Sequence, residues 1–181
     1  MCKVYIVRHG RVDFRWQAWC DSKGFDDDCL NYDISPLTDE SYDIPGLPAG
    51  RIYISTFQRS RDTAEKLFDE PLCTLSDLIG EVPLRSAFDT KIKLPHGLWM
   101  ALGRLQWFLN SSRQAEPRKV TRERARIFAE ILRREDNDCT VVTHGFFMHT
   151  LLSELKREGF KVSGKHAKYK NGELVTAESM V

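Results

Sequence analysis

The sequence lacks both a marked net charge and a long apolar run. Its 27 Lys and Arg residues nearly balance its 26 Asp and Glu residues, so the formal net charge is +1. A chain so close to neutral has no general attraction to nucleic acid or to an anionic membrane surface. No apolar run approaches the roughly 20 residues that cross a bilayer. We therefore expect neither a nucleic-acid partner nor membrane association.

Cysteine patterns typical of disulfide frameworks and structural zinc sites are also missing. The five cysteines are odd in number and scattered, and no two of them form a CxxC pair. The first residues do not combine the charged region, apolar core and small-residue cleavage site that indicate a signal peptide. These features predict a cytoplasmic location, where thiols stay reduced.

Histidines at the spacing of a helical metal site are absent as well. His144 and His149 stand five residues apart, whereas two ligands on one helix face stand four apart. Five residues turn a helix so that the two side chains point roughly 140° apart. We expect no bound metal and no cofactor.

What the sequence does contain is an alternation of apolar runs and helical patterns. Short β-branched or aromatic runs predict buried strands of a parallel sheet. They span residues 4–7, 52–54 and 140–142, with 71–75 as a weaker fourth candidate. Apolar side chains at helical spacing occupy residues 59–68, 121–132 and 146–155. This order predicts an α/β fold, a three-layer α/β/α sandwich around a mostly parallel sheet.

The length of 181 residues suits one domain, and we predict a single domain over residues 1–181. Residues 84–119 interrupt the strand–helix alternation and carry Trp99 and Trp107. We interpret them as an insertion that is helical from about residue 98 to residue 109. Such an insertion could lie over a site, or it could be an ordinary helix whose aromatic side chains form core. The sequence leaves both alternatives open.

Polar motifs follow the predicted strands directly. The carboxyl ends of parallel strands meet at one edge of a sheet, where open α/β folds bind their ligands. Arg59 would lie in the first turn of its helix, beside main-chain N–H groups that favour an anion. The motifs are Arg8-His9-Gly10, Ser55 to Arg59, Thr143-His144-Gly145, and Glu81 in a turn after the weaker strand.

The residue types in these motifs suit the binding and transfer of a phosphoryl group. Arg8 and Arg59 carry planar guanidinium groups that match phosphate oxygens and would hold one phosphoryl group from two sides. Their charges should lower the pKa of His9 and keep its imidazole unprotonated and nucleophilic near neutral pH. His144 would donate a further hydrogen bond. Phosphoryl transfer depends mostly on positioning and electrostatics, so these groups need no metal.

The leaving alkoxide needs a proton, and Glu81 is the candidate donor. Its carboxyl group would then take a proton from the water that attacks the phosphohistidine, which completes a two-step covalent cycle. A carboxyl that donates near neutral pH needs partly apolar surroundings, which Ile79, Val82 and Pro83 would supply. An exposed loop carboxylate is the ordinary alternative.

These motifs, in this order, resemble those of the histidine phosphatase superfamily, in its phosphoglycerate mutase-like branch with an RHG motif. The resemblance also rests on Pro36-Leu37-Thr38 and on Thr63-Ala64, and it runs over about 140 of the 181 residues. It implies a phosphoglycerate mutase-like fold with a nucleophile, a phosphate pocket and a proton donor. The resemblance implies that His9 is the nucleophile and that Glu81 is the proton donor. The phosphate pocket would consist of Arg8, Arg59, His144 and Gly145.

The sequence departs from the family pattern after the RHG motif. The family often continues with Glu-Thr and, soon after, an asparagine that contacts phosphate. Here Arg11-Val12 and Arg15 occupy those places. Either arginine could replace the missing contact, so Arg11 and Arg15 are candidate substrate-binding residues.

The sequence therefore predicts a phosphomonoesterase that acts on a phosphorylated small molecule or a phosphoprotein. A phosphoglycerate-type mutase is an alternative, although such mutases are generally longer. A binding module that holds a phosphorylated ligand without turnover is a second alternative. The oligomeric state stays open.

Overall fold

The computed structural model of the chain describes residues 2–69, 71–163 and 168–180. Contacts between residues divide the chain into two units. The first unit comprises Met1–Arg11, Leu37–Glu81 and Arg122–Val181, and the second comprises Val12–Pro36 and Val82–Thr121. The predicted insertion, residues 84–119, falls within the second unit together with residues 12–36. The assignment of a single domain stays a prediction.

The predicted strands form a six-stranded sheet in the first unit, in the order β4-β3-β6-β1-β8-β7. β4, β3, β6 and β1 run parallel to one another, and β8 runs antiparallel to β1 and to β7. The sheet is therefore mostly parallel, as predicted. Its strands are β1 (Lys3–Arg8), β3 (Ile52–Ser55), β4 (Cys73–Ser76), β6 (Cys139–Thr143), β7 (Phe160–Ser163) and β8 (Leu174–Ser179).

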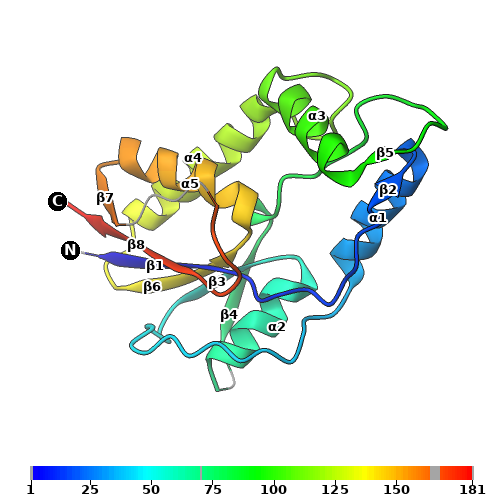
Figure 1. The fold of residues 1–181 in the computed structure, drawn as a ribbon. Helices are drawn as coiled ribbons and strands as arrows, with labels where there is room; N and C mark the ends of the chain where they lie inside the picture. Colours follow the sequence, from blue (N-terminus) through cyan, green and yellow to red (C-terminus); the bar gives the residue numbers. More distant parts are fainter. Residues whose placement is uncertain (1, 70, 164–167, 181) are drawn as a thin grey trace. The chain divides into compact units, whose positions relative to one another are not determined.

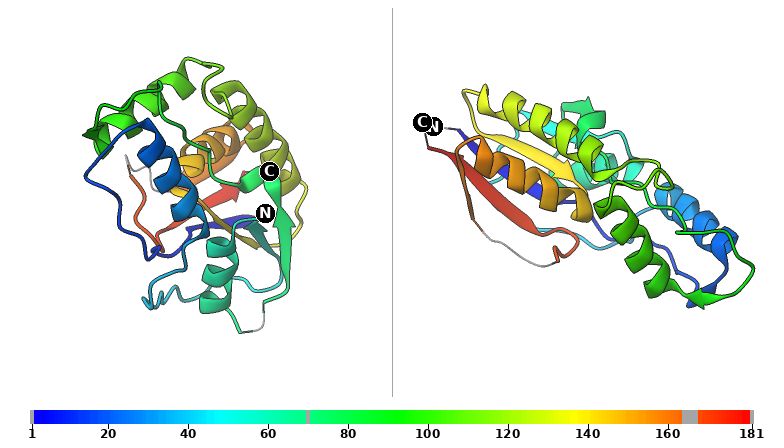
Figure 2. Two further views of the ribbon diagram at one scale, coloured as in Figure 1. Left: turned by 90° about the vertical axis from the view of Figure 1, so that its right-hand side faces the viewer. Right: turned by 90° about the horizontal axis from the view of Figure 1, so that it is seen from above.

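Helices cover both faces of this sheet. Figures 1 and 2 show α4 (Arg118–Arg133) and α5 (Gly145–Arg157) on one face and α2 (Gln58–Leu67) on the other. All residues of β3 and β6 are buried, because both faces of the sheet are covered at these central strands. This arrangement confirms the predicted three-layer α/β/α sandwich.

The apolar pattern of α4 explains why that helix packs on the sheet. Ala125, Phe128, Ala129 and Leu132 recur at helical spacing, and all four side chains are buried. On the other face, Ala64 of α2 packs in one cluster with side chains of β3 and β6. The helical periodicity predicted at residues 59–68 and 121–132 is therefore confirmed.

The second unit is built from α1 (Ser22–Ile34), α3 (His96–Phe108) and a short antiparallel pair, β2 (Trp19–Cys20) with β5 (Leu94–Pro95). The predicted helix at residues 98–109 corresponds to α3. Trp99 and Trp107 are buried, and Trp99 packs against Phe25 of α1. Trp99 thus forms part of the core of this unit. The alternative that the insertion lies over a site stays an untested hypothesis.

Helix α1 was not predicted by the apolar pattern, because its sequence is rich in Asp and carries a glycine. Polar contacts support it instead. Asp21 caps the helix by accepting from the Gly24 N–H at 2.8 Å. Asp28 accepts two hydrogen bonds from Gln17, and Asp26 accepts two from Ser86. The acidic side chains here hold the second unit together.

None of the helices in the described parts of the chain combines the length and the apolar character needed to cross a bilayer.

A turn before β8 docks onto the end of β1. The Gly172 N–H donates to the Arg8 carbonyl at 3.0 Å, and the Arg8 N–H donates to the Glu173 carbonyl at 3.0 Å. Gly172 has φ of +71°, a left-handed conformation that favours glycine. A Cβ at this position would lie 2.1 Å from the ring of Tyr42. Glycine is therefore required both by the backbone and by the packing.

Gly172→Ala should destabilise the protein more than Gly46→Ala. Gly46 also has a positive φ, +79°, but a Cβ there would meet no atom within 4 Å. Gly46→Ala should therefore cost only the backbone strain, about 1 kcal/mol, whereas Gly172→Ala should add about 1–3 kcal/mol from the contact with Tyr42. Urea unfolding of both variants measures the loss in the free energy of unfolding. Equal losses would show that the ring of Tyr42 moves away from the new Cβ at no energetic cost.

Candidate active site

The two histidines of the motifs meet at the carboxyl edge of the sheet. In the parallel pairing of β1 with β6, Arg8 lies opposite Thr143. The pairing continues one residue further, because the His9 N–H donates to the Thr143 carbonyl at 2.8 Å. His9 and His144 therefore leave adjacent strands together, and their ring centroids lie 5.0 Å apart. Both side chains are buried.

Arg59 reaches the same place from the next strand. β3 ends at Ser55, and α2 begins at Gln58, so Arg59 lies in the first turn of the helix. Its side chain is 1% exposed, and its Nε donates to Nδ1 of His144 at 3.2 Å. The guanidinium also lies over the ring of Phe57, 4.4 Å from the centroid. The structure thus brings Arg59 and His144 into direct contact.

Arg8 completes the cluster from the end of β1. Its Nη1 donates to the carbonyl of Tyr169. Among the residues that the structure describes, no group accepts a hydrogen bond from its buried Nε. A Cβ on residue 145 would lie 2.7 Å from this Nε. Gly145 therefore gives Arg8 the room to lie against the start of α5, where main-chain N–H groups also favour an anion.

The hydrogen bond of the His9 ring shows which of its nitrogens carries the proton. Nδ1 lies 2.7 Å from the carbonyl oxygen of Gly10, and since a carbonyl only accepts, Nδ1 carries the proton. Nε2 of the neutral ring then holds a lone pair. Burial, and after it the charges of Arg59 and Arg8, lowers the pKa of His9 from 6.5 to about 3. The ring is thus neutral at physiological pH.

His144 is bonded at both ring nitrogens. Because a guanidinium only donates, Nδ1 of His144 carries no proton where it meets Arg59. The single proton of the neutral ring lies on Nε2, 2.7 Å from Oγ of Ser55. Burial, and after it the neighbouring His9 and Arg59, lowers the pKa of His144 well below its usual value of 6.5. In this state neither nitrogen has a proton to donate to a phosphoryl group.

The carboxyl group of Glu81 lies at the start of α5, the helix that begins directly after His144. Its Oε1 accepts from the Phe147 N–H at 3.0 Å, and its Oε2 lies 3.4 Å from the Phe146 nitrogen, which donates to it. Ile79 is buried, as the sequence suggested, and its carbonyl accepts from the Thr143 hydroxyl at 2.7 Å. Two main-chain donors therefore hold the carboxyl group in addition to apolar surroundings.

Arg11 and Arg15 are both exposed. The guanidinium of Arg11 forms an ion pair with Glu40 at 3.1 Å, and its main-chain N–H donates to the Tyr42 hydroxyl at 2.7 Å. Arg15 belongs to the second unit. A phosphate contact from either arginine stays a prediction.

Asn171 is a functional candidate that sequence reasoning missed. Its Nδ2 donates to the carbonyls of His9 and Gly10, each at 3.0 Å. The Gly10 carbonyl is the group that accepts from the His9 ring, so Asn171 helps to hold the orientation of that ring. Thr63 supports the same loop, because its hydroxyl accepts from the Gly10 N–H at 2.8 Å. The Asn-Gly dipeptide signals a turn, but nothing in the sequence shows where that turn docks.

Within the described ranges, no group of three or more His, Cys, Asp or Glu side chains lies close enough together to hold a metal ion.

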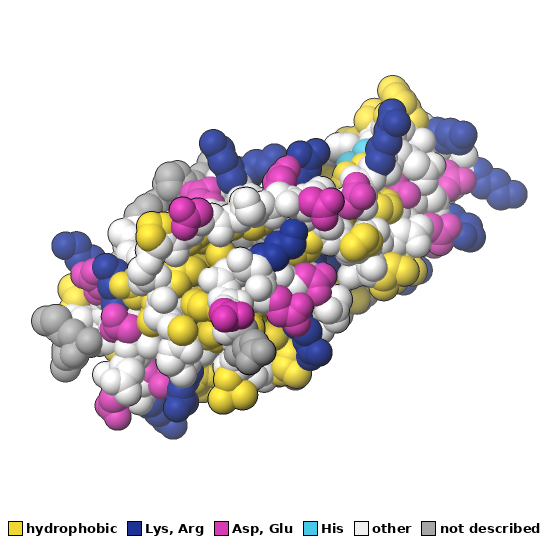
Figure 3. Space-filling view, turned by 90° about the horizontal axis from the view of Figure 1, so that it is seen from below, with side chains coloured by type: hydrophobic (Ala, Val, Ile, Leu, Met, Phe, Trp, Pro, Cys, Tyr) yellow, Lys and Arg dark blue, Asp and Glu magenta, His cyan; other side chains and the backbone are white. Residues whose placement is uncertain are grey.

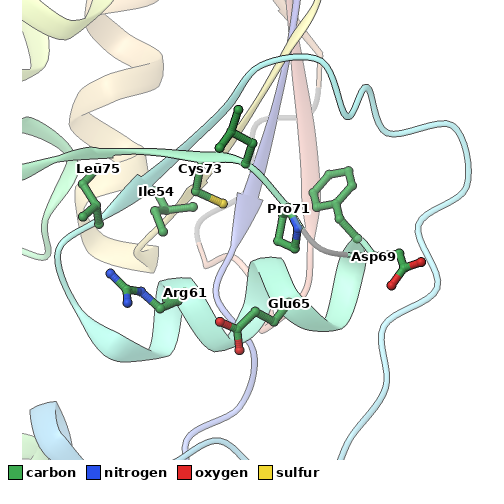
Figure 4. A pocket seen from close by; sticks show the side chains of 9 residues that line it. Ile54, Arg61, Glu65, Asp69, Pro71, Cys73 and Leu75 are labelled. Carbon is green, nitrogen blue, oxygen red and sulfur yellow. The ribbon is translucent and has the colours of Figure 1, made fainter.

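A cavity of about 700 Å³ lies between α2 and β4 in the first unit (Figure 4). Its lining includes Arg61 and Glu65 of α2 and Cys73 and Leu75 of β4, and none of the predicted catalytic residues. Arg61 and Glu65 therefore provide matched controls for the charged residues of the candidate active site.

Hydrophobic side chains also reach the surface on the face shown in Figure 3, among charged side chains of both signs.

The buried neutral state of His9 should make stability depend on pH. Between pH 6.5 and about 3, the ring takes up a proton in the unfolded chain and stays neutral in the folded protein. The unfolded state then binds more protons, so stability falls as pH falls. In this range His9→Asn should reduce the slope of the free energy of unfolding against pH by about 1.4 kcal/mol per pH unit. Urea unfolding at several pH values tests this, and parallel curves for both proteins would contradict it.

Comparisons with known proteins agree with this geometry. A sequence profile described as histidine phosphatase superfamily, branch 1, matches residues 41–178. The matched range includes Arg59, Glu81 and His144, and it begins after Arg8 and His9. No curated protein gives a significant match to the sequence.

Several solved structures share the fold. A mycobacterial glucosyl-3-phosphoglycerate phosphatase has a TM-score of 0.60 at 16% identity, covering 97% of this chain and 89% of that chain. A phosphoserine phosphatase from Entamoeba histolytica, in complex with 3-phosphoglyceric acid, has a TM-score of 0.56 at 16% identity, covering 97% of this chain and 90% of that chain. A phosphoglycerate mutase from Thermus thermophilus has a TM-score of 0.57 at 21% identity, covering 96% of this chain and 91% of that chain.

At these identities the three likenesses confirm a phosphoglycerate mutase-like fold and no particular activity. The profile match is different in kind, because it spans most of the sequence. The chain belongs to the histidine phosphatase superfamily, branch 1.

Proposed function

We propose that this protein is a metal-independent phosphomonoesterase that works through a phosphohistidine on His9. The observation that carries the proposal is the meeting of two buried neutral imidazoles, with ring centroids 5.0 Å apart, beside Arg59 and Arg8. Membership of the superfamily and the phosphatases among its structural neighbours support an enzyme of this class.

In the first step, the lone pair on Nε2 of His9 attacks phosphorus, and the bond from phosphorus to the leaving oxygen breaks. The guanidinium groups of Arg8 and Arg59 hold the phosphoryl oxygens, whose charge they balance. The leaving alkoxide takes a proton from the carboxyl group of Glu81. The products are a phosphohistidine, an alcohol and an ionised Glu81.

In the second step, the Glu81 carboxylate takes a proton from water as the water oxygen attacks phosphorus. The bond from phosphorus to Nε2 breaks, and inorganic phosphate leaves. His9 returns to its neutral form with the proton still on Nδ1, where the Gly10 carbonyl keeps it. Glu81 is protonated again, so the cycle closes with no net change in the protein.

The structural neighbours favour a phosphorylated small molecule as substrate. Two of them are a glucosyl-3-phosphoglycerate phosphatase and a phosphoserine phosphatase in complex with phosphoserine. A phosphoprotein remains the alternative substrate class, and a cytoplasmic location remains part of the proposal.

A mutase is the second candidate, because a phosphoglycerate mutase is among the structural neighbours. A mutase returns the phosphoryl group from His9 to a second hydroxyl instead of to water. Incubation with 3-phosphoglycerate separates the two: a phosphatase releases inorganic phosphate, and a mutase forms the 2-phospho isomer. A module that binds without turnover would do neither, and would leave p-nitrophenyl phosphate intact.

His9→Ala should lower hydrolysis of p-nitrophenyl phosphate by about a thousandfold or more, because the nucleophile is gone. It should also abolish labelling of the protein by a ³²P-phosphorylated substrate. The wild-type label should be lost in hot acid, as phosphohistidine is. Arg61→Ala is the control and should stay within about twofold of wild type, since Arg61 lines the separate cavity. Label that survives hot acid would rule out the proposed intermediate.

Glu81→Gln should slow esters with poor leaving groups more than p-nitrophenyl phosphate. An alkyl phosphate needs a protonated leaving oxygen and should lose about a hundredfold or more in rate. p-Nitrophenolate leaves without a proton, so its phosphoryl-transfer step should change much less. Glu65→Gln provides the matched control, because Glu65 lines the other cavity. Rapid-quench measurement of the first step shows the difference, and equal slowing of both esters would assign the acid role to another residue.

A further inference from the structure

The neutral ring of His144 has no N–H to offer a phosphoryl group. Its Nδ1 accepts from Arg59, and its Nε2–H points to the hydroxyl of Ser55. A donor for the anion appears only when Nδ1 gains a proton, which makes the ring an imidazolium. The N–H on Nε2 then still needs its acceptor, because a buried charge without hydrogen-bond partners is costly.

Ser55 and Ser60 provide that acceptor as a pair of hydroxyls on the far side of the ring. Oγ of Ser55 lies 2.7 Å from Nε2 of His144 and 2.7 Å from Oγ of Ser60. Oγ of Ser60 lies 3.4 Å from the same Nε2. Both serines are fully buried. Because Ser55 accepts from the ring, its own proton points away from Nε2, and Oγ of Ser60 at 2.7 Å is an acceptor within its reach.

This arrangement suits the charged ring as well as the neutral one. Nε2 keeps its proton in both states, so Ser55 does not have to turn when His144 is protonated. A hydroxyl that donates to a second hydroxyl is a better acceptor, since hydrogen bonds in a chain polarise one another. Hydrogen bonds to charged groups are also stronger than those between neutral groups. The pair therefore stabilises the imidazolium more than the imidazole.

We propose that Ser55 and Ser60 are positioning residues that let His144 take up one proton as a phosphoryl dianion binds. This inference rests on the proposed function. A solvent proton adds to Nδ1, and the new N–H bonds to a phosphoryl oxygen. The Nε–H of Arg59 leaves the ring and turns to another phosphoryl oxygen. One dianion and one proton enter the site together, and no covalent bond of the substrate breaks in this step.

The charges that face His144 explain why the proton and the anion enter together. Before an anion binds, burial and the surrounding positive groups keep the ring neutral. A bound dianion reverses the sign of the local field and favours the imidazolium. Four charged or titratable groups face His144: Arg8 at the end of β1, His9 directly after it, Arg59 on α2 and Arg124 on α4.

Proton uptake on binding of a fixed dianion tests the proposal. Tungstate stays a dianion near neutral pH, so any proton taken up at one equivalent must come to the protein. Isothermal titration of the full chain in two buffers of different ionisation enthalpy gives the number of protons per tungstate. We expect about one for the wild type. Two-bond ¹H–¹⁵N spectra should show the signals of His144 moving to imidazolium shifts when tungstate is added.

Removal of the hydroxyl pair should uncouple the two events. Ser55→Ala should weaken tungstate binding by about ten- to hundredfold and reduce the proton uptake. Ser60→Ala should give a smaller effect of the same kind, and Ser55→Thr, which keeps a hydroxyl, should restore most of the uptake. Ser22→Ala is the control, a buried serine of the second unit bonded to Thr90, and should match wild type.

The outcomes separate this proposal from the proposed function. Tungstate binding without proton uptake by the wild type, or uptake unchanged in both alanine variants, would overturn the proposal and leave the phosphatase intact. Failure to bind tungstate together with failure to hydrolyse p-nitrophenyl phosphate would overturn both. If Ser55→Ala does not fold, the spectrum of wild-type His144 decides, since a neutral ring in the tungstate complex excludes the proposed step.

Discussion

The candidate active site depends on one main-chain hydrogen bond, from the His9 N–H to the Thr143 carbonyl. It extends the parallel pairing of β1 with β6 by one residue, so that the two histidines leave the sheet side by side. Had β1 paired with a strand running in the opposite direction, the ends of the two strands would lie at opposite edges. Arg59 arrives at the same edge because β3 also pairs in parallel with β6. The direction of three strands therefore places the candidate phosphate-binding residues at one edge of the sheet.

The sequence predicted this part well because its signals are local. Short β-branched runs identify buried strands, and the motifs follow those strands directly, so parallel pairing brings them together without further information. Helix α1 was missed because its support is polar and tertiary, from residues such as Asp28 and Gln17. Asn171 was missed for a similar reason, since its partner His9 lies 162 residues away. The two main-chain donors to Glu81 depend on how α5 begins, which no sequence pattern reports.

The candidate active site combines groups whose burial together is electrostatically unfavourable in the folded state. Two imidazoles are buried beside guanidinium groups, and burial keeps both rings neutral. In the proposed mechanism, neutrality lets His9 act as the nucleophile, but it leaves His144 without an N–H for a phosphoryl group. The proposed role of the Ser55 and Ser60 hydroxyls meets both demands, because the same arrangement accepts from the neutral ring and binds the charged ring more strongly. An anion that binds this site should also stabilise the fold, since it compensates charges that only the folded state brings together.

The turn at Asn171 and Gly172 makes the orientation of the His9 ring depend on the far end of the sequence. Asn171 lies 162 residues from His9, and β8, which follows the turn, pairs with β1 across similar separations. Because the entropic cost of loop closure grows only slowly with length, the turn and the pairing of β1 form at similar cost. A chain that lacked this last segment would keep all four motifs and would leave the Gly10 carbonyl without its contact from Asn171. Truncation there should therefore disturb the His9 ring without touching any motif residue.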